Sequence, residues 1–409
     1  MLIRKAFRFQ LRTDAALEHE LRRASGCVRF VWNRALAMQK ERLGKSERCL
    51  SYPKMTAELV LWKKAPETSF LQEGHSQALQ QTLKDLDRAL KDAFDKKSPK
   101  RFPKFKKKGV HDSFRFPQGT KLDGDRIYLP KFGWVRFRKS REVEGKIKNV
   151  TVSRHLEHWY ISVQTEMEIG VPVHPSTSAV GIDLGVAKLA TLSTGEVIQP
   201  LNSFRGKEKQ LARAQRALAR KKKFSNNWKK QKAKIARLHA RIADARKDLL
   251  HKTSTTISKN HAVVVLEDLR VKNMSASAKG TLEKPGKNVR AKAGLNKSIL
   301  DQGWFELRRQ LEYKEAWLGG QVIVIEAHHT SQRCSACGHV SPNNRLSQAI
   351  FACEECGHRE NADLNAAKNI LAAGHAVIAC GEVVRPVSTK AASGKQEPTE
   401  RVAKNAKAA

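Results

Sequence analysis

The chain has 409 residues, enough for two or three domains of ordinary size, and 40% of them are hydrophobic, which is compatible with buried cores. Lys and Arg number 78 against 40 Asp and Glu, so the formal net charge is +38, and we infer a polyanionic partner. No apolar run approaches the roughly 20 residues that a membrane-spanning helix needs, so we expect no membrane insertion.

The first twelve residues alternate apolar and polar side chains, which favours a β-strand over a signal peptide. Four of the seven cysteines form two Cys-x-x-Cys pairs. This pattern indicates a metal site in a reducing compartment rather than a disulfide framework, so we expect a cytoplasmic protein.

Residues 13–111 are predicted to be largely helical. Thr13 or Asp14 is placed to cap the first helix, and residues 77–96 form a strongly periodic segment. Its apolar side chains recur at steps of three and four and predict one core-facing stripe: Leu79, Leu83, Leu86, Leu90 and Phe94. Residues 98–109 carry six Lys or Arg and two Pro, which excludes a regular helix and favours a basic linker.

Short strands are predicted from residue 112 to residue 172, at 126–129, 135–138, 148–153 and 159–164. Gly and Pro separate these runs. Together with residues 1–12 they predict a small β-barrel domain.

Residues 173–372 are predicted to form a second, α/β domain, with strands at 179–184, 187–192, 262–267 and 321–326 and a helix at 304–318. We expect residues 279–297 to be mobile and residues 373–409 to be mostly disordered, because neither segment shows a periodic apolar pattern.

A basic helical insertion interrupts this domain at 203–260. Residues 205–252 hold 18 Lys or Arg against three acids, a local excess of 15. The opposite, apolar face of the predicted helix comprises Ile235, Leu238, Ile242, Ala245 and Leu249.

The two Cys-x-x-Cys pairs predict a structural zinc ribbon at residues 330–360. Fifteen residues separate the pairs, and a glycine follows each one. Four thiolates complete the tetrahedron that Zn²⁺ prefers and leave no open position for water, so we expect a structural metal. The four ligands are Cys334, Cys337, Cys353 and Cys356.

Three acids are predicted to end or begin elements of the second domain. Asp183 follows an apolar strand, Glu267 ends the run VVVLE, and Asp363 opens a predicted helix. Carboxylates from separate elements can hold two divalent ions about 4 Å apart, which is an arrangement for phosphodiester cleavage, and Mg²⁺ suits such oxygen ligands. Each acid alone is more often a turn former or helix cap, but their order follows the layout of the ribonuclease H fold. Asp268 competes with Glu267, although alternation turns its side chain the other way.

The chain resembles the TnpB family, the transposon-encoded relatives of type V CRISPR effector nucleases. The segments that carry the resemblance are GIDLGVAKLAT, VLEDLRVKNM, GWFELRRQLEYKEAWLG, TSQRCSACG and NADLNAAKNI, over residues 181–370. Weaker similarity in the N-terminal half comes from FRFQLR, CVRFVWNRAL, FPKFKKK, SFRFPQG and LPKFGWVRF. Many relatives carry an acidic DRD before the final NAA; this chain has Asn361-Ala362-Asp363 and keeps Asp at the catalytic position.

The resemblance implies an α+β multidomain protein in which a β-barrel wedge with an inserted helical recognition region precedes a ribonuclease H-like (RuvC) domain with an inserted zinc ribbon. It implies that Asp183, Glu267 and Asp363 are the catalytic, Mg²⁺-binding triad of a bacterial, nucleoid-associated enzyme. It also implies a guide RNA from the transposon end, double-stranded target DNA next to a short motif, and a monomeric ribonucleoprotein. Pairing between RNA and DNA carries most of the sequence specificity in such enzymes.

Candidate nucleic-acid contacts follow from the resemblance and from the basic clusters. A plain surface or packing role remains open for each of Tyr52, Thr56, Gln80, Lys104, Lys106, Lys107, Lys221, Lys222 and Lys223.

Two other functions remain open. A binding protein that does not cut could use the same nucleic-acid grooves to regulate transcription or transposition, although all three acids are present. A transposase that joins strands would use similar metal chemistry.

Overall fold

The computed structural model describes residues 1–281, 283–326 and 329–379. It divides into two compact units, residues 1–170 and a second unit that begins at Val171. Among the described residues, no helix is both long and apolar enough to cross a membrane. The predicted disordered segment from residue 380 onward lies outside the described residues.

The strands of the first unit form two antiparallel sheets. A four-stranded sheet has the order β1-β7-β6-β2, from β1 (Leu2–Gln10), β7 (His158–Glu168), β6 (Lys146–His155) and β2 (Ser113–Phe116). A three-stranded sheet contains β3 (Lys121–Asp123), β4 (Arg126–Leu129) and β5 (Gly133–Arg136).

The end of β1 connects the two sheets. Leu11 pairs with Phe137, just beyond β5, and its backbone N–H donates to the Trp159 carbonyl of β7 at 2.8 Å. The strands thus follow one continuous order from β2 to β3. Within residues 1–170 no backbone pairing joins these two outer strands, so ladder hydrogen bonds do not close the predicted barrel.

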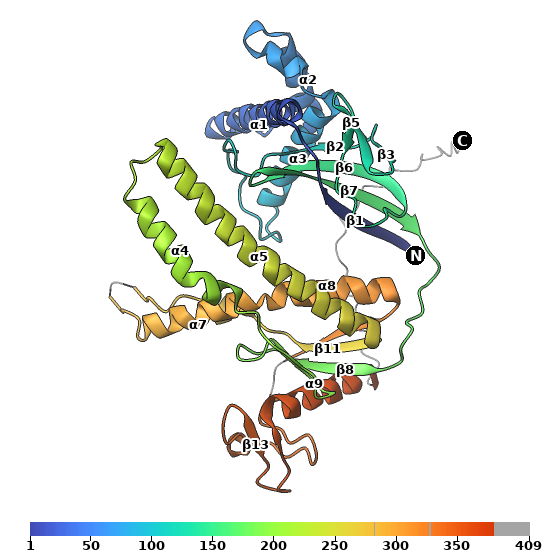
Figure 1. Cartoon of the computed structure of the whole chain (residues 1–409), viewed down its shortest axis with the longest axis vertical. Coiled ribbons are helices and arrows are strands. Elements are labelled where there is room, and N and C mark those ends of the chain that lie inside the picture. The colour runs from blue at the N-terminus through green and yellow to red at the C-terminus, as the bar shows by residue number, and fades with distance from the viewer. Residues whose placement is uncertain (282, 327–328, 380–409) are drawn as a thin grey trace, which may run out of the picture. The chain divides into compact units, whose positions relative to one another are not determined.

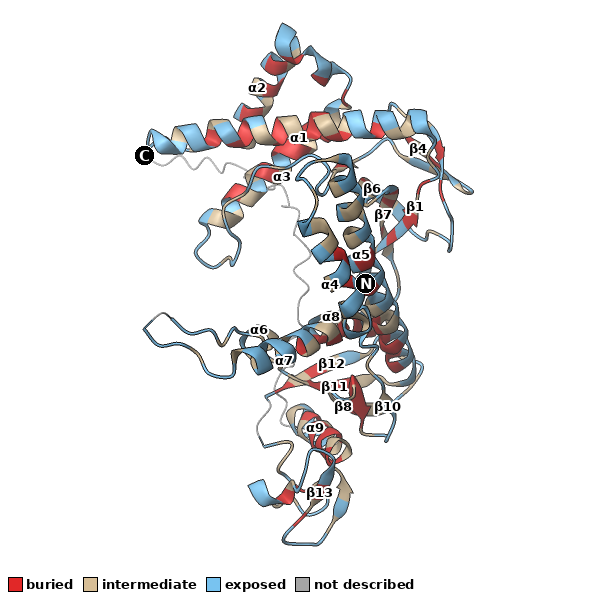
Figure 2. Ribbon diagram, turned by 60° about the vertical axis from the view of Figure 1, so that its left-hand side comes forward, coloured by how far each residue is buried: buried red, intermediate tan, exposed pale blue. Residues whose placement is uncertain are grey.

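The helices of the first unit lie between β1 and β2 in the chain: α1 (Ala15–Gly44), α2 (Tyr52–Lys64), the 3₁₀ helix η1 (Pro66–Gln72) and α3 (Ser76–Phe94). Asp14 caps α1, as predicted, because its side chain accepts from the Leu17 N–H at 2.8 Å. Figure 2 shows buried residues recurring along α1. In α3 the four leucines of the predicted stripe are buried, whereas Phe94, its last residue, is 57% exposed because the helix projects beyond the core there.

Strands and helices of the first unit share one hydrophobic core. Phe9 and Leu11 from the strand end, Leu36 from α1, Leu83 from α3 and Trp159 from β7 all belong to it. The predicted wedge and recognition regions therefore pack together as one compact unit.

The basic segment 98–109 contains no helix or strand, but it is fixed to α1. The Trp32 indole N–H donates to the Lys104 carbonyl at 3.0 Å. Asn33 donates to the Lys106 carbonyl at 3.0 Å and accepts from the Lys106 N–H at 2.7 Å. The segment predicted to be a linker is thus an anchored part of the first unit.

The second unit is built on a mixed five-stranded sheet. The order is β10-β9-β8-β11-β12, from β10 (Val197–Ile198), β9 (Ala190–Leu192), β8 (Ala179–Asp183), β11 (Val263–Glu267) and β12 (Gln321–Ile325). The first three strands in the chain form an antiparallel meander, and β11 and β12 run parallel to β8 and to each other. Figure 1 shows α5 and α8 on one side of the sheet and α9 on the other.

Two core clusters correspond to the two faces of this sheet. Val264 and Leu266 of β11 pack with residues of α5 (Asn226–Asn260) and α8 (Trp304–Leu318). Val265 instead packs with Ile370 of α9 (Ala362–Ala379). Because side chains alternate along a strand, each residue of β11 can be assigned to one face.

The other helices and strands of the second unit are short or stand outside the sheet: α4 (Ser203–Ala219), α6 (Val271–Met274), α7 (Val289–Gln302), η2 (Pro342–Asn344), β13 (Ile350–Ala352) and β14 (Arg359–Asn361). Helix α7 corrects the expectation that residues 279–297 are mobile throughout, because Ile299 packs in the core and stabilises the helix. Helix α9 continues to Ala379, so residues 373–379 are helical and not part of a disordered tail.

The apolar face of α5 also differs from the prediction at one position. Leu238 and Ile242 pack with α4, but Ala245 is exposed and Leu250 is buried. The helix packs first with α4 and then with α8, so its buried face shifts between the two partners.

Candidate functional site

Asp183 and Glu267 end neighbouring parallel strands and project from the same face of the sheet. Asp183 shares its face with Gly181, and Glu267 shares its face with Val265. Gly181 lies so close to α9 that a Cβ atom there would be 2.2 Å from the carbonyl oxygen of Ala367. Both carboxylates therefore lie on the α9 side of the sheet.

Asp363 reaches this region from the first turn of α9. The Asn361 side chain accepts from the N–H groups of Asp363, at 3.1 Å, and Leu364, at 3.3 Å, which caps the helix. Lys188 Nζ lies 2.9 Å from Asp363 Oδ2, and Arg345 Nη2 lies 3.8 Å from its Oδ1. The carboxylate is thus partly neutralised by two cations.

The three carboxylates interact with one another. Burial, together with the negative charges of Glu267 and Asp363, raises the pKa of Asp183 to about 7, against the opposing effects of Arg345 and Lys188. Among the described residues, however, the three acids do not form a cluster with one ligand atom each within 4.8 Å of the others. The acids are thus close enough for the charges of Glu267 and Asp363 to affect the pKa of Asp183. Their carboxylate oxygens are not all within 4.8 Å of one another.

Glu267 is held by a contact that sequence reasoning missed. Thr330 Oγ1 donates to Glu267 Oε1 at 2.5 Å, and the Thr330 carbonyl accepts from Asn369 Nδ2 of α9 at 2.9 Å. Asn365, one turn earlier, donates to the Arg333 carbonyl at 2.8 Å. The spacing of four residues between the asparagines in NADLNAAKNI could have indicated one polar helix face.

Asp268 does not compete with Glu267 for the acidic group. Its Oδ1 accepts from Arg308 Nη1 of α8 at 2.8 Å, so its side chain turns to the opposite face, as alternation predicts.

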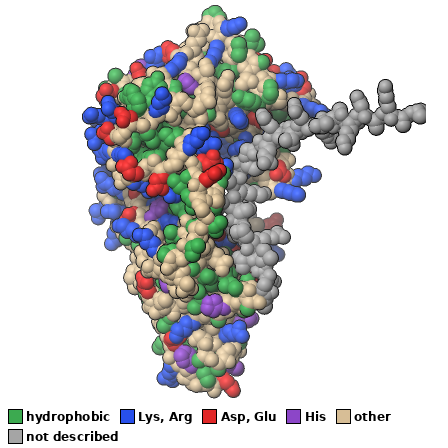
Figure 3. All heavy atoms as spheres, turned by 90° about the vertical axis from the view of Figure 1, so that its right-hand side faces the viewer, with side chains coloured by type: hydrophobic (Ala, Val, Ile, Leu, Met, Phe, Trp, Pro, Cys, Tyr) green, Lys and Arg blue, Asp and Glu red, His purple; other side chains and the backbone are tan. Residues whose placement is uncertain are grey.

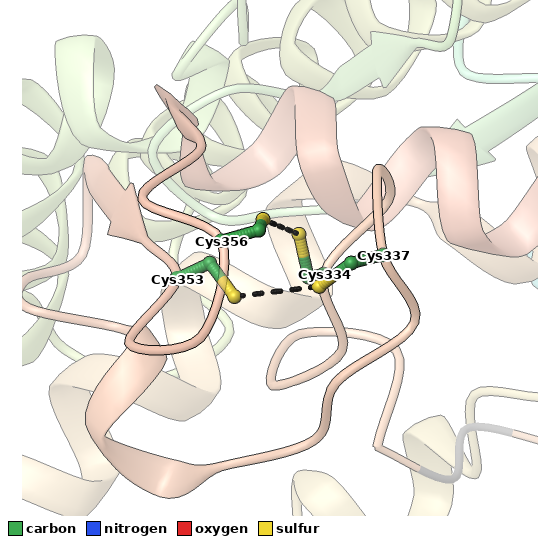
Figure 4. Close-up of side chains that lie close together, drawn as sticks. All are labelled: Cys334, Cys337, Cys353 and Cys356. Carbon is green, nitrogen blue, oxygen red and sulfur yellow. Dashed lines mark hydrogen bonds between the residues drawn. The ribbon is translucent and has the colours of Figure 1, made fainter.

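The four predicted zinc ligands lie together, as Figure 4 shows. Their sulfur atoms are all within 4.8 Å of one another, and the closest contacts are Cys334–Cys356 at 3.7 Å and Cys337–Cys353 at 3.6 Å. Four sulfurs placed about 2.3 Å from a central Zn²⁺ lie about 3.8 Å apart, so the two closest sulfur–sulfur contacts match a tetrahedral zinc site and the remaining pairs lie within 4.8 Å.

Two equivalent turns present these sulfurs. The N–H of Gly338 donates to the Cys334 carbonyl at 3.0 Å, and the N–H of Gly357 donates to the Cys353 carbonyl at 3.1 Å. Both glycines have a positive φ, 81° and 70°, which explains the residue type after each pair.

The candidate contacts on α2 and α3 differ in accessibility. Tyr52 packs partly against the core of the first unit. Thr56 Oγ1 donates to the backbone carbonyls of Tyr52 and Pro53, which leaves its oxygen only as an acceptor. Gln80 is exposed.

The candidate lysines of the basic segment are not equivalent. Lys106 Nζ lies 4.2 Å from the centre of the Trp32 ring, and burial lowers the pKa of this ammonium group. Lys104 and Lys107 are exposed. Of the three candidates on this segment, Lys104 and Lys107 are thus the ones that are accessible to a phosphate.

Lys221, Lys222 and Lys223 lie at the turn between α4 and α5. Lys222 and Lys223 are exposed, and Lys221 lines a groove of about 470 Å³ along the two helices. The groove also contains four other cations: Lys230, Lys234, Arg237 and Arg241. Figure 3 shows Lys and Arg side chains interspersed with acidic and hydrophobic side chains on the face that it displays.

Three family models match parts of the chain. Residues 160–278 match the OrfB_IS605 model, described as "Probable transposase", and residues 304–370 match a "Cas12f1-like, TNB domain". Residues 1–48 match a "Helix-turn-helix domain", where the structure has β1 followed by the single unbroken helix α1.

Two curated relatives are similar over nearly their whole length. The chain is 58% identical to the "Putative RNA-guided DNA endonuclease InsQ" of Escherichia coli K12, over 97% of this chain and 98% of that one. It is 39% identical to a "Putative RNA-guided DNA endonuclease" of Streptomyces pristinaespiralis, over 97% and 96% of the two chains.

Among solved structures, the fold resembles that of the protein in a Cas12f1-sgRNA-target DNA complex. The TM-score is 0.51 at 14% sequence identity, with 90% of this chain and 98% of that chain covered. A likeness at this identity supports the mixed α+β fold alone.

Proposed function

The chain belongs to the TnpB family of transposon-encoded proteins, and on this premise we propose that it is an RNA-guided DNA endonuclease. Its substrate is double-stranded DNA next to a short flanking motif. The observation that carries the catalytic part of the proposal is the convergence of three interacting carboxylates, Asp183, Glu267 and Asp363, from β8, β11 and α9.

The sheet supports a ribonuclease H-like assignment for the second unit. An antiparallel meander is followed by two parallel strands, and the first acid ends the central strand of the sheet. The predicted domains, 1–12 with 112–172, 13–111 and 173–372, fit this proposal, with the zinc ribbon inserted just before α9.

The donor set fits Mg²⁺. Burial and the charges of the two neighbouring carboxylates raise the pKa of Asp183, so a divalent cation would stabilise the ionised group, and all the ligands that the three acids offer are oxygens. Two bound ions would supply activation of the attacking water and stabilisation of the leaving oxygen.

The chain's own residues then orient the reaction. Thr330 fixes one carboxylate oxygen of Glu267, and the Asn361 cap fixes the start of the helix that carries Asp363. Lys188 and Arg345 contact Asp363 and supply positive charge beside the position of the scissile phosphate.

The zinc ribbon has a structural role in this proposal. Ser335 N–H, directly after Cys334, donates to Asn365 Oδ1 at 2.9 Å, which ties the ribbon to α9. One Zn²⁺ held by four thiolates keeps no open position, so it stabilises the ribbon and, through α9, the location of Asp363.

The nucleic-acid partners are a guide RNA from the transposon end and its matched DNA target. The charge of +38 and the cationic groove between α4 and α5 suit contacts to phosphates. We propose that one protein copy binds one RNA.

The test is to purify the protein co-expressed with its transposon-end DNA and to sequence the RNA that copurifies. The proposal predicts one discrete RNA whose end matches the sequence flanking the transposon. Random fragments, or none, would contradict it and favour a binding regulator without a guide. Products with joined rather than free ends would instead indicate a strand-joining transposase.

A further inference from the structure

Residues 171–178, which we call the connector, join the first unit to β8 of the second. Val171 and Val173 are 85% and 89% exposed, whereas the side chain of His174 is only 3% exposed. This reverses the usual preference, because valine is buried more often than histidine. Apolar burial therefore does not hold the middle of the connector, and the polar contacts of His174 do.

His174 contacts α5 and its own segment through both ring nitrogens. Nε2 lies 2.8 Å from the Ser258 carbonyl oxygen of α5, which accepts a hydrogen bond from it. Nδ1 lies 3.0 Å from both the N–H and the carbonyl oxygen of Ser176, so it can accept a hydrogen bond when unprotonated and donate one when protonated. The ring is thus held in place in either charge state.

Glu315 of α8 faces His174 in the interior of the second unit. It is fully buried, and its Oε2 lies 3.9 Å from His174 Nε2. The turn after α8 packs closely around the pair: a Cβ atom on Gly320 would be 2.1 Å from Glu315 Oε2, and one on Gly319 would be 2.1 Å from the Pro172 carbonyl oxygen. Among the described residues, neither carboxyl oxygen has a hydrogen-bond partner with good geometry. An ionised carboxyl group here is therefore poorly solvated and has only His174 to balance its charge.

The other titratable groups around this pair are engaged elsewhere. Lys314, the neighbour of Glu315 in α8, bonds to α5 through its ammonium group. His261, which follows α5, has its Nδ1 2.8 Å from the Ser178 hydroxyl. The glycine turn after α8 carries no titratable side chain. Among the described residues, His174 is thus the group whose charge acts on Glu315.

We propose that the connector is a latch operated by one proton: it stays on the second unit while His174 and Glu315 share a titratable proton, and it is released when that proton is lost. With the proton, the pair has no net charge, whichever side chain carries it. Without the proton, a buried carboxylate faces a neutral ring, so the connector must move away to admit water. Release would lengthen the free chain between the two units, since β7 ends at Glu168 and β8 begins at Ala179.

The pH range of the latch follows from the two environments of Glu315. Burial raises the pKa of Glu315 from 4.5 to about 7, against the opposing effects of the Ser258 hydroxyl and of His174. A carboxyl group whose pKa is higher in the closed state stabilises that state fully below its ordinary pKa. This stabilisation is lost as the pH rises through the higher value. The latch is therefore most stable below about pH 4.5 and least stable above about pH 7.

The test is hydrogen exchange of the full-length protein at pH 5.5 and pH 8, followed in peptides that cover the connector and corrected for the intrinsic exchange rate. In wild type we expect the protection of the connector to fall about thirtyfold between the two pH values. Glu315→Gln keeps the shape of the side chain but has no titratable proton, so it should keep its protection at pH 8. Glu306→Gln is the matched control, because Glu306 lies on the same helix but bonds to Arg309, and it should behave as wild type.

His174→Ala removes the contact itself and should leave the connector unprotected at both pH values. An equal fall in wild type and Glu315→Gln would overturn the inference, because another group would then control the connector. Loss of protection in Glu315→Gln at both pH values would also overturn it, because the charged carboxylate would then be what holds His174. The measurement needs neither RNA nor cleavage, so its result is independent of the proposed endonuclease function.

Discussion

Asp183 is the residue in which the demands of folding and of function conflict most clearly. Its carboxylate is buried beside two other acids, so its charged form is unfavourable in the folded protein without a metal. Because its folded pKa, about 7, lies above the unfolded value of 3.8, the stability that the protonated form provides is present below about pH 4. That stability is lost as the pH rises through 7.

Asp183→Asn should therefore stabilise the metal-free protein at pH 8, by about 2–4 kcal/mol, and have little effect at pH 4. Thermal unfolding in EDTA at the two pH values measures this difference. Asp268→Asn is the control, because Asp268 pairs with Arg308 on the opposite face and should give no gain. An equal effect of both substitutions at pH 8 would contradict the arrangement of the three acids.

Thr330→Val should lower kcat about tenfold and leave target binding unchanged. The substitution removes the O–H donor of Glu267 at nearly constant volume, so the carboxylate loses its fixed orientation. Single-turnover cleavage with saturating RNA measures the effect. Thr255→Val, which makes the same change on the exposed side of α5, should cleave normally; equal losses in both variants would indicate a general destabilisation.

The acids could be predicted from the sequence because each ends or begins a recognisable element. Lys188, Arg345 and Thr330 could not, because each contacts an acid more than 15 positions away in the chain, and only the fold brings them together. Whether Asp183, Glu267 and Asp363 are catalytic stays a prediction.

At the scale of elements, hydrogen bonds join the predicted zinc ribbon to α9. The ribbon contains little apolar core beyond Phe351, so we expect its fold to depend on a bound metal. Asn365 and Asn369 bond its first residues to the helix that carries Asp363.

Purified protein should contain one Zn²⁺ per chain, and Cys353→Ser should lose it. We expect the variant to cut at least tenfold more slowly and to keep its binding of guide RNA. Metal analysis and cleavage assays measure both effects. Cys49→Ser, at a cysteine outside the cluster, should keep its zinc and activity; full activity of a zinc-free Cys353→Ser protein would refute the coupling.

The turn between α4 and α5 should contact phosphates through its three successive lysines. Changing Lys221, Lys222 and Lys223 together to Ala should reduce the magnitude of the slope of log affinity against log salt concentration by about 2–3, because each lysine would contribute one phosphate contact. Binding titrations of guide RNA at several salt concentrations test this. The control triple is Lys45, Lys91 and Lys252 to Ala, since each of these lysines pairs with an acid one turn away; an equal change in slope would mean that only total charge matters.

Elements with a strong period could be predicted closely, and elements set by tertiary contacts could not. The helix at 304–318 and the strand at 126–129 have the predicted bounds. Helix α7 was missed because only Ile299 and Gln302 of its residues are buried, too few to give a pattern. The exposure of Ala245 follows from the change of partner along α5, which a single sequence does not reveal.

At the scale of the whole molecule, the chain is strongly basic but carries one acidic site in its second unit. The family is shown by near full-length similarity to relatives, and the mixed α+β fold agrees with the sequence-based expectation. The charge of +38 attracts RNA and DNA, and the three acids lie where a divalent cation can offset their repulsion.

The most direct measurement is cleavage of a plasmid that carries the matched target, by the purified RNA complex in Mg²⁺, with wild type compared with Asp183→Asn. The account predicts a linear product from wild type, none from the variant, and equal binding of the target by both. Equal cleavage by the two proteins, or binding of the target by wild type without any cleavage, would contradict it.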